Sequence, residues 1–126
     1  MNKKIIIFGG TGGLGSQLVS KLEVEGYTVK GLSSKDVDVT DYAQVEGVMQ
    51  EHRPDIVINL AGANADSFLH KLSDTSNREA ARKVMKVNTV GVVNVVAAAL
   101  PHMRSNQYGR IILTSSVLTK KPVMGT

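Results

Sequence analysis

The stretch Lys3-Lys-Ile-Ile-Ile-Phe-Gly-Gly-Thr-Gly-Gly-Leu-Gly15 decides how this chain folds. Residues 5–8 form an apolar, β-branched run that predicts a buried strand, and the glycines after it leave no side chains in the way of a ligand. From Gly13 to about Glu25 the pattern is helical, because one face repeats apolar residues at close to four-residue spacing: Leu14, Leu18, Val19 and Leu22. We therefore expect a strand, a glycine turn and a helix that packs back on the strand.

This turn predicts an anion site. Its free backbone N–H groups and the positive end of the helix dipole point at one spot, which suits a pyrophosphate. Its glycines satisfy three dinucleotide-binding spacings at once, namely GxGxxG, GxxGxxG and GxxxGxG. The phosphate loop of nucleotide triphosphatases needs a lysine after its last glycine, where this chain has Ser16. A tight turn without a ligand is the other alternative. The residues expected at the cofactor phosphates are Gly9, Thr11, Gly12, Gly13, Leu14 and Gly15.

Composition indicates one soluble globular domain, residues 1–126, with 42% apolar and 21% charged residues. The net charge of +4 is spread along the chain and aromatic residues are few, so no nucleic-acid groove is expected. Without cysteine, and with His52, His70 and His102 far apart and assigned to the surface or to loops, no metal site is expected. Only four apolar residues precede the glycines, too few for a secretory signal or a membrane span, so we expect a cytoplasmic protein.

The end of the second predicted strand, residues 27–32, bears on the choice of cofactor. An acid at this place binds the ribose hydroxyls of NAD, whereas hydroxyl and basic groups accommodate the 2′-phosphate of NADP. Ser33, Ser34 and Lys35 come first here, followed by Asp36. The sequence therefore favours NADP and leaves NAD open.

The remaining elements alternate between strand and helix. Residues 36–41 predict a very short strand, and Thr40 or Asp41 can cap a helix from about residue 42 to residue 52. Further segments follow in order: a buried strand at 55–62 that forms a second wall for the cofactor, a polar substrate-side loop at 63–77 with a short turn near 68–72, a helix at 78–104, and a last strand at 109–116. This order predicts a Rossmann-type doubly wound parallel sheet in a three-layer α/β/α arrangement, truncated after the fifth strand, with its ligand at the carboxyl ends of the strands.

The helix at 78–104 is apolar almost all round, so we expect it to be buried against the sheet and also against a subunit partner or a further segment. We therefore expect homo-oligomerisation through this helix. Asn88 and Asn94 stand out within it because asparagine is a poor residue for a helix interior, and Asn94 is expected to face a polar gap.

Five motifs in register resemble the short-chain dehydrogenase/reductase family over nearly the whole chain. They are the glycine turn at 9–15, Asp38-Val-Thr-Asp41, Asn59-Leu-Ala-Gly62, Asn88-Thr-Val-Gly91 and Gly109-Arg-Ile-Ile-Leu-Thr-Ser-Ser116. The resemblance implies an oxidoreductase that transfers hydride between NADP(H) and a carbonyl or alcohol substrate. It also implies roles for single residues: Asp38 and Val39 hold the adenine, Asn59, Ala61 and Gly62 shape the wall beside the ribose, Asn88 positions a proton-relay water, and Ser116 binds the substrate oxygen.

The chain departs from this family in two places. The connection between the second strand and Asp38 is short, as in the extended, nucleotide-sugar-modifying members. The catalytic YxxxK motif, which the family places about a dozen residues after the serine, is absent, because neither Tyr27, Tyr42 nor Tyr108 has lysine four residues later. We therefore expect the cofactor-binding part of a reductase, inactive as the isolated chain. There are two alternatives: a non-catalytic dinucleotide-binding module, and a fragment of an extended-type nucleotide-sugar epimerase or dehydratase.

Overall fold

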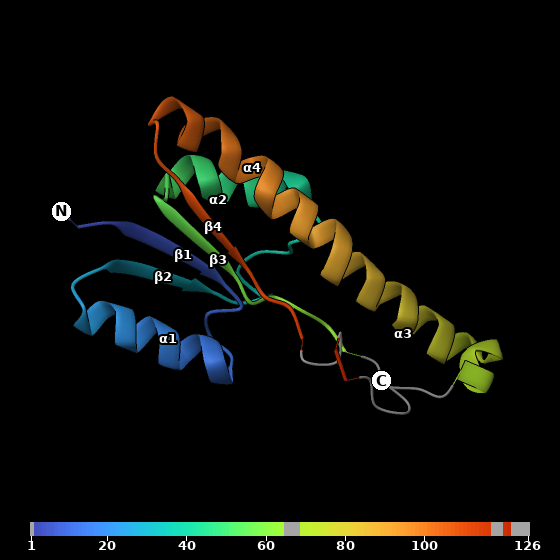
Figure 1. The fold of residues 1–126 in the computed structure, drawn as a ribbon. Helices are drawn as coiled ribbons and strands as arrows, with labels where there is room; N and C mark the ends of the chain where they lie inside the picture. The colour runs from blue at the N-terminus through green and yellow to red at the C-terminus, as the bar shows by residue number, and fades with distance from the viewer. Residues whose placement is uncertain (1, 65–68, 117–119, 122–126) are drawn as a thin grey trace.

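A computed structural model describes residues 2–64, 69–116 and 120–121, and its centre is a parallel sheet (Figure 1). Within the described residues the sheet has four strands in the order β2-β1-β3-β4. Their bounds are β1 (Lys4–Phe8), β2 (Thr28–Leu32), β3 (Ile56–Asn59) and β4 (Arg110–Leu113). From β1 the chain moves outward to β2 on one side of the sheet, and after β2 it crosses to β3 on the other side of β1. The direction of the strand order therefore reverses between β1 and β3. This reversal of strand order is where doubly wound sheets bind their ligands.

Helices cover both faces of the sheet. Helix α1 (Gly13–Val24) lies on one face, and α2 (Tyr42–His52) and α4 (Gly91–Ser105) lie on the other (Figure 1). Because side chains alternate along a strand, β1 supplies both cores. Ile5 and Ile7 pack in the core on the α1 side, whereas Ile6 and Phe8 pack with residues of α2 and α4. The predicted three-layer, doubly wound architecture is confirmed.

Helix α1 differs from its prediction at one position. Leu18, Val19 and Leu22 pack on the sheet as expected, but Leu14 is 68% exposed. Leu14 lies in the first turn of the helix, beside the glycine turn and past the carboxyl end of β1, so no strand lies beneath it.

The very short strand predicted at 36–41 does not form. The carboxylate of Asp36 accepts hydrogen bonds from the backbone N–H (2.7 Å) and hydroxyl (2.9 Å) of Ser33, and the carboxylate of Asp38 accepts them from the N–H (2.9 Å) and hydroxyl (2.7 Å) of Thr40. Such local bonds give the backbone an alternative to pairing in a sheet. The segment is therefore a loop, and residues 110–113 form the fourth strand of the described chain instead of the fifth.

Helix α2 is capped as predicted. The carboxylate of Asp41 accepts from the N–H groups of Ala43 (3.0 Å) and Gln44 (3.4 Å), which have no partner within the helix. The helix ends at Arg53 in a left-handed conformation, with φ of 45°.

The long helix begins earlier than predicted and has a break in its hydrogen-bond pattern. After a 3₁₀ turn, η1 (Leu69–Ser73), it runs as α3 (Thr75–Met85), a π-helical turn, η2 (Lys86–Val90), and α4. The loop predicted at 63–77 is thus shorter, and the part of it at 65–68 lies outside the described residues.

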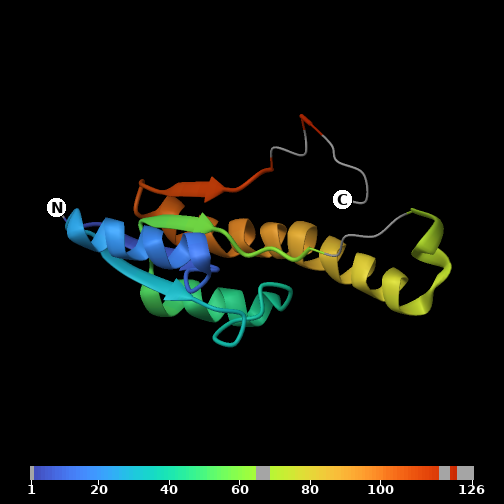
Figure 2. The ribbon, with the colours of Figure 1, turned by 90° about the horizontal axis from the view of Figure 1, so that it is seen from below.

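Burial of the long helix is uneven. No residue of α3 is buried, and α3 extends past the end of the sheet (Figure 2). In α4, Val95 and Ala99 are completely buried, whereas Val93 is 60% exposed. In the single chain, α3 and the outer side of α4 are therefore exposed, and the predicted cover by a subunit partner or a further segment stays a prediction. The span Thr75–Ser105 is long and apolar enough to cross a membrane, but only by length and composition, a test that core helices also pass.

One histidine at the end of α4 is buried. His102 is 8% exposed, which corrects its assignment to the surface, and its Nε2 lies 2.6 Å from the carbonyl oxygen of Pro54. Because a carbonyl only accepts, Nε2 carries the proton in this bond.

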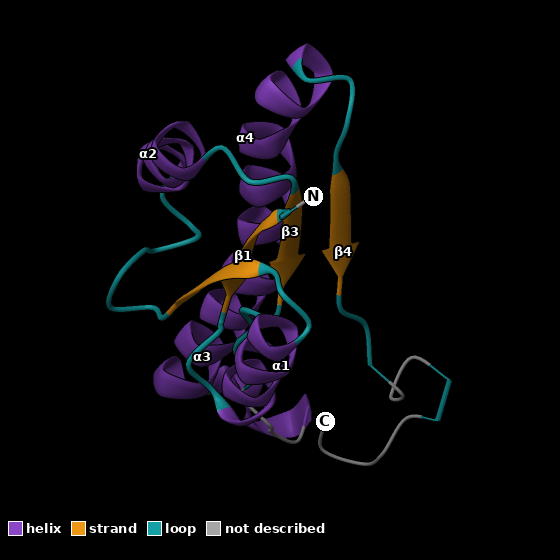
Figure 3. Ribbon diagram, turned by 90° about the vertical axis from the view of Figure 1, so that its left-hand side faces the viewer, coloured by secondary structure: helices purple, strands orange, loops and turns teal. Residues whose placement is uncertain are grey.

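Strand β4 forms one edge of the sheet (Figure 3), and its Ile112 and Leu113 are exposed.

Candidate cofactor site

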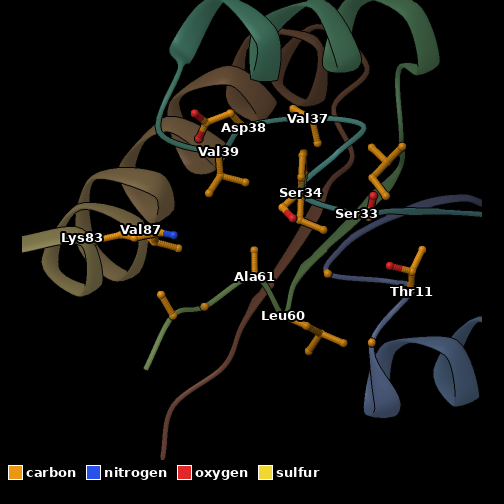
Figure 4. A pocket seen from close by; sticks show the side chains of 16 residues that line it. Thr11, Ser33, Ser34, Val37, Asp38, Val39, Leu60, Ala61, Lys83 and Val87 are labelled. Carbon is orange, nitrogen blue, oxygen red and sulfur yellow. The ribbon is translucent and has the colours of Figure 1, made fainter. Parts of the chain in front are cut away.

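A cavity of about 610 Å³ opens beyond the carboxyl ends of β1, β2 and β3 (Figure 4). Three chain segments and the long helix form its walls. The lining residues that the sequence predicts for the cofactor are Gly9, Thr11, Gly12, Ser33, Ser34, Asp38, Val39, Ala61 and Gly62. The structure thus brings together residues from three separate motifs at the edge of the sheet where a ligand is expected.

The glycine turn forms the first wall and is held against β2. The N–H groups of Gly9 and Gly10 donate to the carbonyl oxygen of Leu32, at 2.8 Å and 3.2 Å. Gly9 has φ of +77°, a conformation that favours glycine. A Cβ atom at Gly10 would overlap the backbone of Gly31, and one at Gly15 would overlap the carbonyl oxygen of Gly9. The fold itself therefore requires glycine at these positions.

Gly12 and Gly13 have a different status. A Cβ at Gly12 would make only an ordinary contact, 3.6 Å from the oxygen of Gly9, and one at Gly13 would meet no atom within 4 Å. Helix α1 begins at Gly13 with no side-chain cap, so the N–H groups of its first turn have no side-chain acceptor. Open space next to uncapped helix donors fits a phosphate group. Gly13, Leu14 and Gly15 are not among the residues that line the cavity, and their contribution would be these N–H groups.

The loop after β2 forms the second wall. Ser33 and Ser34 line the cavity, whereas Lys35 does not. The hydroxyl of Ser33 donates to Asp36 and accepts from the N–H of Lys35 at 3.2 Å. Hydrogen bonds from the backbone and hydroxyl of Ser33 hold the pKa of Asp36 below its usual range. The acid that left NAD open is therefore engaged with Ser33 and lies outside the cavity lining.

The same wall continues through Asp38 and Val39. Hydrogen bonds from the hydroxyl and backbone of Thr40 hold the pKa of the Asp38 carboxyl below its usual range, and the N–H of Asp38 donates to Oε1 of Gln44 at 2.9 Å. Val39 is 7% exposed. Its carbonyl oxygen accepts a 2.9 Å hydrogen bond from Nδ2 of Asn94, so Asn94 has a specific partner where the sequence predicts only a polar gap.

The segment after β3 forms the third wall. Asn59 is buried outside the cavity lining, where its Oδ1 accepts from the N–H of Ala61 at 3.1 Å and its carbonyl accepts from Thr114 at 3.1 Å. Asn88 accepts from the N–H of Ala63 at 2.8 Å and donates to its carbonyl at 2.9 Å. Both polar atoms of the Asn88 side chain are therefore bonded to the third wall. Its assignment to a proton-relay water stays a prediction.

The long helix contributes two lining residues that the sequence did not predict, Lys83 and Val87 (Figure 4). Among the described residues that line the cavity, Lys83 is the one cation, although the sequence assigns it to the solvated surface. The signal that could have found this pair is its four-residue spacing, which puts both side chains on one helix face immediately before the Asn88 motif.

Ser116, the other predicted catalytic residue, is exposed and lies outside the cavity lining, three residues after the end of β4. Among residues 2–64, 69–116 and 120–121, no group of three or more histidine and acidic side chains is arranged to hold a metal ion.

Comparison with known proteins connects this site to one family. A family model described as short chain dehydrogenase matches residues 33–126, which leaves the glycine turn outside the matched range. The chain is 31% identical over 129 residues to the 3-ketodihydrosphingosine reductase of Bacteroides thetaiotaomicron, covering 90% of this chain and 46% of that protein. It is 27% identical over 143 residues to the acetoacetyl-CoA reductase of Paracoccus denitrificans, covering 96% and 57%.

A solved structure gives the same result for the fold. The dTDP-4-dehydrorhamnose reductase of Bacillus anthracis, in complex with NADP, superposes with a TM-score of 0.70 at 27% identity, covering 88% of this chain and 35% of that one. The chain spans about half the length of the curated relatives named above. With its parallel sheet, its glycine turn and the family match over residues 33–126, this chain belongs to the short-chain dehydrogenase family.

Proposed function

We propose that this chain binds NADP in the cavity and is the cofactor-binding part of an oxidoreductase acting on a carbonyl or alcohol substrate. The observation that carries the proposal is the open space at Gly13, next to uncapped helix donors at the strand-order reversal between β1 and β3. The reductase from Bacillus anthracis, whose structure contains NADP, supports the choice of ligand.

The walls would divide the cofactor between them. The N–H groups of the first turn of α1, at Gly13, Leu14 and Gly15, would hold the pyrophosphate. Ser34 and Lys35 would hold the 2′-phosphate, since the hydroxyl of Ser33 already donates to Asp36. The adenine would lie between Val39 and Ala61, with Asp38 beside it.

Catalysis needs more than this chain contains. When bound, the nicotinamide supplies or receives a hydride. In the short-chain dehydrogenase/reductase family a tyrosine of YxxxK handles the accompanying proton, and the present sequence has no such motif. General acid–base help is worth roughly 10²–10⁴-fold in rate, and Ser116 can orient a substrate oxygen without relaying a proton. The chain by itself therefore binds cofactor and does not turn over.

We also propose a homo-oligomer in the cytoplasm, and the exposed side of the long helix supports the oligomer. Met85, Val90 and Val93 are large apolar residues that stand exposed along this helix. A second copy that covers them would complete the burial that the sequence predicts. The opposite side of α4 packs on α2 and β3.

The test is a calorimetric titration of the protein with NADPH and with NADH, combined with light scattering on the same sample. We expect binding with preference for NADPH and a mass above that of one chain. A folded protein that binds neither nucleotide would refute the cofactor proposal, and a monomeric mass would refute the oligomer. Equal affinity for the two nucleotides would keep the site and remove the preference for NADP.

A further inference from the structure

The long helix contacts two opposite walls of the cavity. Asn88 is paired with Ala63 on the wall after β3. Gly91 and Asn94 contact Val39 on the wall after β2: a Cβ at Gly91 would lie 2.8 Å from Cγ2 of Val39, and Nδ2 of Asn94 donates to the Val39 carbonyl. The π-helical turn η2 contains Asn88 and ends immediately before Gly91. One helix therefore contacts both walls.

The wall at Val39 is tied to the rest of the domain by apolar packing, since Val39 lies in the same core as Phe8 and Val95. The side-chain hydrogen bonds at Ser33, Asp36 and Asp38 join residues two to six positions apart in sequence. The bond from Asn94 reaches across 55 positions. Local bonds fix the shape of this loop, and, in the described part of the chain, the bond from Asn94 is the long-range hydrogen bond that adds to apolar packing in holding the loop against the rest of the domain.

Val39 and Ala61 face one another across the cavity (Figure 4). We infer that Asn94 is a positioning residue for the cofactor: by holding the carbonyl of Val39, it sets the width of the slot between Val39 and Ala61 in which the adenine binds. This inference rests on the proposed function. Asn94 does not line the cavity, so it would act on binding through Val39, whose carbonyl it holds.

The amide of Asn94 can donate a hydrogen bond to the Val39 carbonyl, whereas the side chain of aspartate, which has nearly the same size, cannot. An amide N–H donates to a carbonyl oxygen, whereas the carboxylate that Asn94→Asp introduces only accepts, and its negative charge would face that oxygen. The variant keeps the size of the side chain and reverses the interaction. Asn106, at the end of the same helix and exposed, provides the matched control, Asn106→Asp.

The experiment titrates the wild type, Asn94→Asp and Asn106→Asp with NADPH and with adenosine 2′,5′-bisphosphate, the adenosine half of NADPH. All titrations are made well below the unfolding temperature of each variant, measured by circular dichroism. We expect Asn94→Asp to weaken both ligands by about tenfold and by the same factor, because both need the adenine slot. Asn106→Asp should bind both as the wild type does.

Each other outcome has a defined meaning. Wild-type affinity in folded Asn94→Asp, even at a lower unfolding temperature, would reduce Asn94 to a structural role and overturn the inference. Should Asn94→Asp not fold, Asn94→Ser removes the donor without adding charge, and the same criterion applies; failure of both to fold would equally overturn the inference. A wild type that binds neither ligand would instead refute the proposed function, on which the inference depends.

Discussion

The glycine turn and the loop at 33–41 form adjacent walls of one cavity, yet they are built by different means. The turn is held by backbone packed on backbone, with Gly10 against Gly31 and Gly15 against Gly9. The loop is held by carboxylates that accept local hydrogen bonds. A methyl group added at Gly10 or Gly15 should therefore break the first wall and leave the second unaffected, whereas loss of a charge should do the reverse.

The largest effect is expected at Gly15. Its Cβ would overlap the backbone of Gly9, which cannot give way without moving the whole turn, so Gly15→Ala should lower the free energy of unfolding by about 3 kcal/mol. Gly13→Ala makes the same change two residues earlier in open space, and should leave stability unchanged or raise it by up to about 1 kcal/mol. Urea unfolding of both variants measures the difference. Equal losses of stability would contradict the distinction between the two glycines.

The next largest effect separates binding from folding at the same turn. Gly13→Val puts a branched side chain where the pyrophosphate would lie, and should lower NADPH affinity by about a hundredfold in a protein that remains folded. Gly47→Val is the matched control, because Gly47 is also a helical glycine with no atom near its missing Cβ, and it lies in α2 outside the cavity lining. Calorimetry on both variants should show the loss only at position 13. Unchanged affinity there would remove the assignment of the turn to the cofactor.

These two predictions mark how far the sequence can be interpreted. Residue spacing predicts the strand, the turn and α1, because hydrophobic periodicity and glycine runs report local geometry. The spacing does not distinguish Gly15, which the fold needs, from Gly13, which it does not. That difference depends on the close approach of Gly9 and on the open space at the helix start, and both arise only after the elements pack together.

Long-range contacts escaped prediction for the same reason. Asn94 stands out in the sequence as an unusual helix residue, but its partner Val39 lies 55 residues away and cannot be inferred from local sequence. The even spread of charge along the sequence places Lys83 on the solvated surface, whereas the packed helix brings it to the cavity. The false strand at 36–41 arose from alternating acids and valines, a pattern of period two that local hydrogen bonds of Asp36 and Asp38 override.

A smaller effect is expected on the second wall, where substitutions should change the preference for NADPH over NADH. Replacing both Ser34 and Lys35 by alanine should weaken NADPH about tenfold and NADH much less, since a charge-assisted contact to the 2′-phosphate is lost. The control replaces Ser20 and Lys21, an equivalent pair on α1 outside the cavity lining. Titrations with both nucleotides give the ratio of affinities. An equal change for NADPH and NADH would remove the case for the phosphorylated cofactor.

The smallest effect is the pH dependence that only the second wall should show. Hydrogen bonds from Ser33 and Thr40 lower the pKa values of Asp36 and Asp38 below 3.8, so their stabilising contribution is present above about pH 4 and is lost as the pH falls through the lowered values. Asp36→Asn combined with Asp38→Asn should therefore flatten the decline in the free energy of unfolding below about pH 4, measured by urea unfolding at a series of pH values.

The control for this acid titration is Glu79→Gln, at an exposed acid of α3 for which the described part of the chain shows no hydrogen bond or ion pair. It should leave the wild-type slope unchanged. Because the backbone contacts of the glycine turn contain no titrating group, Gly13→Ala should also keep that slope. If the slope stayed the same in the double variant, the two carboxylates would not be what holds the loop. The two walls would then differ only in where they lie. A slope that flattens only in the double variant would place the acid-sensitive part of the site on the side of the adenosine, away from the pyrophosphate.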